Sequence, residues 1–177
     1  MIIGVTALAR AGKDTFADYL VSKYGFSKLN MSDVLTEELG RLGRPQTKDQ
    51  MSLLGDEWRK QYGMDIVIRR TLEKAAKQEK TIITGFRSVE EVEFMKANSG
   101  NFYLVAIVAD MDVRFGRRNE LDPDTLEGFT ARDERDVQKK GLGKVIDKAD
   151  YKLANNYKTQ EEFYKDIDGL MQKIKGA

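Results

Sequence analysis

The first fifteen residues of the chain join an apolar segment to a loop of small residues. Residues 1–6 read MIIGVT and residues 7–15 read ALARAGKDT. This pattern predicts a buried strand over 2–6, a tight loop, and a helix from about 14 to 24. Such a loop leaves backbone N–H groups unpaired at the positive end of a helix, where phosphate binds. The segment therefore predicts a phosphate-binding loop; the alternative is an ordinary strand-to-helix turn with a solvated lysine.

The loop matches the G-x-x-x-x-G-K-[S/T] pattern only in part. Gly12 and Lys13 fit, whereas Ala7 stands at the first glycine position and Asp14 at the serine or threonine position, with Thr15 one place later. A lysine at this place brings a mobile ammonium group to the β- and γ-phosphates of a nucleotide. The preceding strand and the following helix both support this interpretation.

The composition restricts the chemistry that the chain can perform. The 177 residues include no cysteine and no histidine, and the net charge is +1. Thiolate chemistry and histidine-based acyl transfer are therefore excluded, which leaves carboxylates, lysine, arginine and a bound cation. The length suits one domain over 1–177, and the balanced charge gives no sign of a nucleic-acid or membrane partner. We expect a cytoplasmic protein, monomeric or homodimeric.

Short apolar runs alternate with helical patterns, which predicts a three-layer α/β fold with a five-stranded parallel sheet. The expected strands are 2–6, 27–31, 81–84, 102–109 and 151–154. Capping-box spacing predicts helix starts at Thr47, Ser88 and Thr159. The last helix has an apolar face that we expect to pack on the sheet, formed by Phe163, Ile167, Leu170, Met171 and Ile174.

Two stretches interrupt this alternation. One spans 36–79, is expected to be helical and contains Trp58, and the other spans 113–140 and is rich in arginine. Insertions on the carboxyl side of a parallel sheet are where such folds bind substrates. We therefore expect 36–79 to bind an acceptor and 113–140 to form a small lid.

Two segments resemble motifs of adenylate kinases. Residues 24–35 (YGFSKLNMSDVL) are similar to Y-G-x-x-x-(I/L)-S-x-G-D-(M/L)-L, and residues 85–87 (GFR) are similar to D-G-F-P-R with one residue missing. The chain thus resembles the P-loop nucleoside monophosphate kinase superfamily over nearly its whole length. Its G-K-D-T form is similar to phage deoxynucleoside monophosphate kinases and to archaeal adenylate kinase-related or dephospho-CoA kinase-like proteins.

This resemblance implies Mg²⁺-dependent transfer of the γ-phosphoryl group of ATP to a small phosphorylated acceptor, such as a nucleoside monophosphate. Two alternatives stay open: a dephospho-CoA kinase-like enzyme, and a non-catalytic nucleotide-binding regulatory protein. The second is suggested by Thr84, which stands where adenylate kinases carry an aspartate, and by the departures from the loop motif at Ala7 and Asp14.

The candidate site residues follow from the loop, the resemblance and the arginine-rich stretch. The expected catalytic residues are Lys13, Arg87, Arg114 and Arg118. The expected nucleotide contacts are Ala9, Arg10, Ala11, Gly12, Lys13, Asp14, Thr15, Arg114 and Asn156. The expected magnesium partners are Thr15, Asp14 and Asp33. Each of these residues also has a possible structural role. Asp14 and Asp33 could be acids that stabilise a helix start, and the arginines could be solvated or ion-paired on a helix surface.

Overall fold

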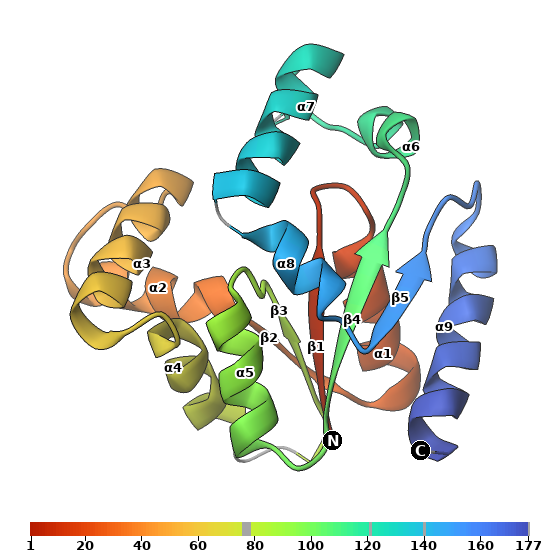
Figure 1. Ribbon diagram of the computed structural model, residues 1–177, viewed down its shortest axis with the longest axis horizontal. Coiled ribbons are helices and arrows are strands. Elements are labelled where there is room, and N and C mark those ends of the chain that lie inside the picture. Colours follow the sequence, from red (N-terminus) through yellow and green to blue (C-terminus); the bar gives the residue numbers. More distant parts are fainter. Residues whose placement is uncertain (76–78, 121, 140, 177) are drawn as a thin grey trace.

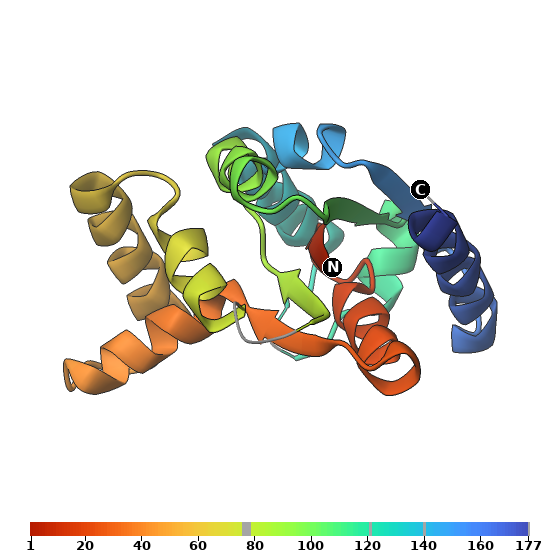
Figure 2. The same ribbon diagram turned by 90° about the horizontal axis from the view of Figure 1, so that it is seen from below.

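The computed structural model describes residues 1–75, 79–120, 122–139 and 141–176. Its centre is a parallel five-stranded sheet with the order β2-β3-β1-β4-β5. The strands are β1 (Ile2–Ala7), β2 (Ser27–Asn30), β3 (Thr81–Thr84), β4 (Phe102–Val108) and β5 (Tyr151–Ala154). The predicted fold class is therefore confirmed, with helices on both faces of the sheet (Figures 1 and 2).

The strand boundaries differ from the prediction by one residue at most. β3 and β5 have the predicted limits, β1 continues to Ala7, and β4 ends at Val108. β2 ends at Asn30 because Met31 already belongs to the next helix, α2 (Met31–Arg41). The backbone N–H of Asn30 donates to Asp33 Oδ2 at 3.2 Å, which fixes the start of that helix.

One face of the sheet is covered by α1 (Lys13–Tyr24) and α9 (Gln160–Gly176), and the other by α5 (Val89–Asn98) and α8 (Leu142–Asp147) (Figure 2). Ile3 and Val5 are fully buried against the α1 and α9 side. Gly4 faces the opposite side, where a Cβ atom would lie 2.8 Å from the rings of Phe86 and Phe102. The α9 face that was predicted to be apolar is buried at all five positions.

A lobe of three helices projects beside α5 (Figure 1). It consists of α2, α3 (Lys48–Tyr62) and α4 (Ile66–Ala75). Leu39, Leu54 and Ile68 are buried in its core, together with Trp58. The helical insertion expected over 36–79 thus begins five residues earlier, at Met31; residues 76–78 lie outside the described residues.

A second group of helices stands at the carboxyl edge of the sheet (Figure 1). It contains α6 (Met111–Gly116), α7 (Leu126–Glu134) and the π-helix η1 (Arg135–Lys139). The ring of Phe129 is fully buried and meets Phe115 edge-on, with centroids 5.6 Å apart. We refer to the described residues of 111–139 as the lid segment; of the predicted range 113–140, positions 121 and 140 lie outside the described residues. In the described part of the chain, every helix lacks the length and apolar character needed to cross a bilayer.

Candidate nucleotide-binding site

The carboxyl ends of the parallel strands bring four connecting segments to one edge of the sheet. They are the loop 8–12 after β1, the segment 85–88 after β3, the turn 109–110 after β4, and the segment 155–157 after β5. This is the edge at which open α/β sheets bind ligands. The structure thereby places the predicted phosphate-binding loop, Arg87 and Asn156 at the same edge.

Loop 8–12 leads directly from β1 into α1, and Gly12 is the N-cap residue. Gly12 has a φ of +104°, and a Cβ atom at this position would lie 2.1 Å from Asn155 Nδ2. That amide nitrogen donates to the carbonyl of Ala11 at 2.8 Å, and Asn155 is buried. Glycine is therefore required here for two reasons, the backbone conformation and the contact with Asn155. The helix start itself has no side-chain cap.

The lysine of the motif forms an ion pair with the unusual aspartate next to it. Lys13 Nζ lies 2.7 Å from Asp14 Oδ1, and Lys28 Nζ lies 3.5 Å from the same oxygen and 2.8 Å from Asp18 Oδ1. Partial burial raises the pKa of Asp14, but the two ammonium groups outweigh this effect, so its pKa is lowered. Asp14 is therefore a charged group held between two lysines.

The predicted magnesium partners do not form a carboxylate cluster. Asp33 accepts hydrogen bonds from the backbone N–H of Asn30 at 3.2 Å and from its side chain. Asn30 Oδ1 in turn accepts from the hydroxyl of Thr84 at 2.6 Å. Across the described ranges, no group of three or more carboxylate, histidine or cysteine side chains is arranged to hold a metal ion. The contacts of Asp33 are those of an acid at a helix start, which is the structural alternative given above for this residue.

Arg87 follows β3 and has an exposed side chain. Its backbone N–H donates to Glu91 Oε2 at 2.8 Å, and Ser88 N–H donates to the same oxygen at 3.1 Å. Ser88 and Glu91 also complete the predicted capping box of α5. The position of Arg87 is therefore fixed through its backbone, while its guanidinium group faces solvent at the sheet edge.

Arg114 reaches the phosphate-binding loop, but its donors bind protein acceptors. Nη1 donates to the carbonyl of Ala9 at 3.2 Å, and Nε donates to the carbonyl of Ala109 at 3.0 Å. Nη2 lies 2.6 Å from Asp133 Oδ2 in α7, and both side chains are buried. Arg114 thus ties the loop to the lid segment, and its catalytic role stays a prediction.

The other sequence-predicted residues of this edge occupy more peripheral positions. Arg118 is exposed, stacks 4.0 Å from the ring of Phe115 and donates to the carbonyl of that residue. Asn156 is exposed and accepts the N–H of Asp110 at 2.8 Å. Its neighbour Asn155 makes the contact with the loop, and the expected role of Asn156 as a nucleotide contact stays a prediction.

Asp122 connects the lid segment to the loop and was not predicted as a site residue. Its carboxylate lies 2.5 Å from Arg10 Nε and 2.6 Å from Arg132 Nη1. Arg132 also stacks 4.3 Å from the ring of Phe129. The composition of the segment could have identified it, because Asp122 is an acid followed by proline within a stretch rich in arginine.

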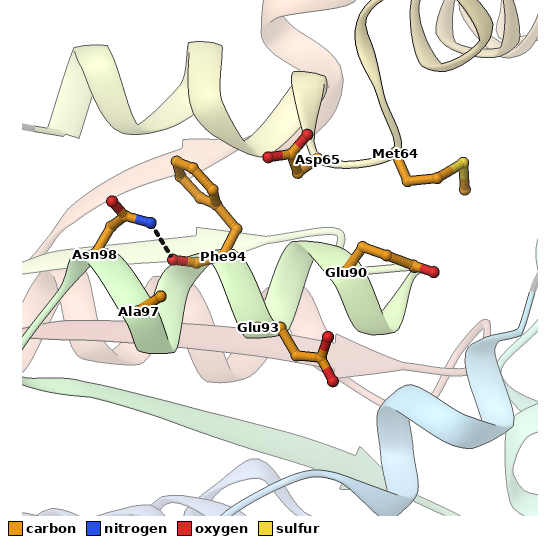
Figure 3. Close-up of a pocket in the computed structure, with 7 residues that line it drawn as sticks. All are labelled: Met64, Asp65, Glu90, Glu93, Phe94, Ala97 and Asn98. Atoms are coloured by element: carbon orange, nitrogen blue, oxygen red, sulfur yellow. Dashed lines mark hydrogen bonds between the residues drawn. The ribbon is translucent and has the colours of Figure 1, made fainter.

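A cavity of about 490 Å³ lies elsewhere, between the start of α4 and the outer face of α5. Its lining residues, shown in Figure 3, include Phe94 and three acids, Asp65, Glu90 and Glu93. Three carboxylates repel a phosphorylated ligand, so this cavity does not suit the acceptor. A second cavity, of about 560 Å³, is lined by Phe102 and Tyr151 at the opposite, amino edge of the sheet.

The fold and this loop define a class of protein, the P-loop kinase-like NTPases. A family model described as an AAA domain matches residues 8–136. The chain is 38% identical over 168 residues to the UPF0200 protein of Thermoplasma volcanium, covering 93% of this chain and 92% of the relative. It is 36% identical over 167 residues to the UPF0200 protein of Thermoplasma acidophilum, covering 92% and 91%. The chain belongs to this AAA domain family and to the UPF0200 family.

Solved structures support the fold. The shikimate kinase of Bacteroides thetaiotaomicron aligns with a TM-score of 0.67 at 15% identity, covering 99% of this chain and 98% of that structure. The shikimate kinase of Aquifex aeolicus aligns with a TM-score of 0.62 at 20% identity, covering 98% and 97%. At these identities the likeness establishes a common architecture.

Proposed function

We propose that this protein transfers the γ-phosphoryl group of ATP, with Mg²⁺, to a small phosphorylated acceptor such as a nucleoside monophosphate. The observation that carries the proposal is the geometry of loop 8–12. Its N-cap glycine has a φ of +104° and leads into α1 without a side-chain cap, with Lys13 at the first helical position. Such a helix start binds a polyphosphate through backbone N–H groups and the helix dipole.

The chain supplies electrostatic groups for this reaction, and no covalent intermediate is required. The ammonium group of Lys13 would break its ion pair with Asp14 and follow the charge that develops on the transferring phosphoryl group. Arg87 is exposed at the sheet edge beside the helical lobe, where its planar guanidinium group suits an acceptor phosphate. Arg114 and Arg118 would lie on the lid side of the transferring group.

Magnesium would shield the charge of the phosphates, and the donor set fits an ion bound mainly through phosphate oxygens and water. Thr15 is half-buried in the first turn of α1 and is the hydroxyl that would complete its shell. Asp14 would act only through water, because its Oδ1 atom faces Lys13 and Lys28.

A second candidate is a nucleotide-binding regulatory protein without phosphotransfer. One observation favours it: Thr84, at the position of the adenylate kinase aspartate, is buried and donates to Asn30. A dephospho-CoA kinase-like activity is the alternative within the kinase class, because the adenylate kinase arginine after the D-x-L segment is replaced here by Thr36.

The test combines ATP binding with transfer from labelled ATP to a panel of nucleoside monophosphates, dephospho-CoA and shikimate. Lys13→Ala is expected to weaken ATP binding at least tenfold. The matched control is Lys173→Ala, at an exposed position on α9, which leaves binding unchanged. Binding without transfer to any acceptor supports the regulatory alternative. Equal ATP affinity in the wild type and Lys13→Ala overturns the proposal.

A further inference from the structure

Loop 8–12 contains a residue in an unfavourable backbone conformation. Among the described residues other than glycine, Arg10 alone has a positive φ, at +65°. The Ala11 N–H closes a turn by donating to the Leu8 carbonyl at 3.3 Å, and Arg10 is the third residue of that turn. Turns with a positive φ at this position strongly favour glycine, because a Cβ atom makes the left-handed conformation costly.

The left-handed conformation matters for anion binding. Concave sites for phosphate form where successive backbone N–H groups converge, as they do when right-handed and left-handed residues adjoin. Arg10 provides a left-handed step in this loop, and Gly12 provides another. If Arg10 relaxed to a negative φ, the N–H groups of the loop would no longer converge in the same way.

The side chain of Arg10 is held by a buried carboxylate of the lid segment. Asp122 Oδ2 accepts from Arg10 Nε at 2.5 Å and from the backbone N–H of Asn119 at 2.9 Å. Asp122 Oδ1 accepts from Arg132 Nη1 at 2.6 Å. Only 7% of the Asp122 side chain is exposed, so these charge-assisted contacts are weakly screened by solvent.

We infer that Asp122 is a positioning residue that holds Arg10 in its left-handed conformation and thereby couples the lid segment to the phosphate-binding shape of loop 8–12. The inference rests on the proposed function and adds regulation to the same site. When the lid segment lies on the loop, the Asp122 contact stabilises the conformation that binds phosphate. When it moves away, Arg10 loses that support and phosphate affinity falls, so nucleotide release accompanies lid opening.

The first experiment measures the ATP affinity of Asp122→Asn by calorimetric titration in the presence of Mg²⁺. The substitution keeps the size of the side chain but removes its charge, and we expect ATP affinity to fall about tenfold. The matched control is Asp124→Asn, which removes one charge at an exposed position of the same connection. This control is expected to leave affinity within about twofold of the wild type.

The second experiment separates backbone positioning from a merely structural role of Asp122. Glycine adopts a positive φ without cost, so Asp122 has little left to stabilise in an Arg10→Gly background. In that background, Asp122→Asn is expected to change ATP affinity by less than about twofold. If Asp122→Asn costs the same factor in both backgrounds, Asp122 does not act through the conformation of Arg10, and the inference is wrong.

A third measurement separates this inference from the proposed function. Amide hydrogen exchange is followed at Ala11, whose N–H closes the turn, in protein without nucleotide. Asp122→Asn is expected to speed this exchange about tenfold, whereas Asp124→Asn does not. If the wild type binds no ATP but Asp122→Asn still speeds exchange at Ala11, the proposed function is wrong and the coupling between Asp122 and loop 8–12 is supported. Equal exchange in both variants overturns the coupling even if ATP binds.

Discussion

The guanidinium group of Arg59 lies 3.3 Å from the carboxylate of Glu91, with Nη2 facing Oε1. Arg59 belongs to α3 of the helical lobe, whereas Glu91 lies in α5. Glu91 is fully buried, and its other carboxylate oxygen accepts the backbone N–H groups of Arg87 and Ser88. The pair therefore fixes the lobe relative to the segment that carries Arg87.

Removing the Glu91 carboxylate is expected to destabilise the protein strongly. Glu91→Ala leaves Arg59 and two backbone N–H groups without their acceptor, so we expect the free energy of unfolding to fall by about 3 kcal/mol. Urea denaturation measures this change. Glu90→Ala, at the exposed neighbouring position, is the control, with an expected loss below about 1 kcal/mol. Similar losses in the two variants would show that the buried pair does not stabilise the fold.

The contacts of Asp14 with two lysines predict how the aspartate in the motif affects ATP binding. Asp14 Oδ1 faces Lys13 and Lys28, so Asp14→Asn removes a negative charge near the proposed phosphates. In the proposed function Asp14 contacts magnesium only through water. We expect ATP to bind about threefold more tightly and Mg²⁺ dependence to be retained. Titrations with and without Mg²⁺ test this. The control is Asp18→Asn, which alters Lys28 one turn further along α1. Loss of the Mg²⁺ dependence in Asp14→Asn alone would identify Asp14 as a magnesium partner.

Two glycines at the ends of α1 allow backbone strain to be separated from steric overlap. Gly12 and Gly25 both have positive φ, at +104° and +70°, but a Cβ atom meets Asn155 at Gly12 and open space at Gly25. Gly25→Ala is expected to cost about 1 kcal/mol of stability through conformation alone. Gly12→Ala should cost at least about 2 kcal/mol and abolish ATP binding, because loop 8–12 must also move. Thermal unfolding and ATP titration measure the two effects, and equal stability losses would contradict a close contact with Asn155.

The fold was predictable because its signals are local. The apolar run 102–109 and the capping-box spacing at Ser88 depend on neighbouring residues, and they located β4 and the start of α5 to within a residue. The start of the helical lobe was harder to predict. Met31 continues the alternation of Leu29 and Asn30, so the sequence favours strand at this position. In the structure, the N–H of Asn30 bonded to Asp33 marks the start of a helix there.

The candidate site was only partly predictable, because its supporting contacts join residues far apart in the chain. The motif located loop 8–12 and Lys13, but Asn155 reaches that loop from 144 positions away and Asp122 from 112. Local patterns carry no information about such pairs. Which of Asn155 and Asn156 faces the loop also follows from the sheet rather than from the sequence of the segment after β5.

The carboxylate of Asp122 predicts a pH dependence of stability. Burial raises its pKa, but the Asn119 N–H and the guanidinium groups of Arg132 and Arg10 outweigh this effect and lower the pKa from 3.8 to about 2. A carboxyl group with a lower pKa in the folded state contributes stability above its unfolded pKa. That contribution is lost as the pH falls through the folded pKa.

We therefore expect the free energy of unfolding of the wild type to exceed that of Asp122→Asn by about 2 kcal/mol at neutral pH. The difference should stay constant down to about pH 5 and shrink between about pH 4 and about pH 2, where protonation of Asp122 removes the same charge as the substitution. Urea denaturation of both proteins across this range measures the difference. Asp124→Asn serves as the control, with a difference from the wild type near zero throughout. A difference for Asp122→Asn that does not change down to about pH 2 would mean that the Asp122 charge does not stabilise the contact between the lid segment and loop 8–12.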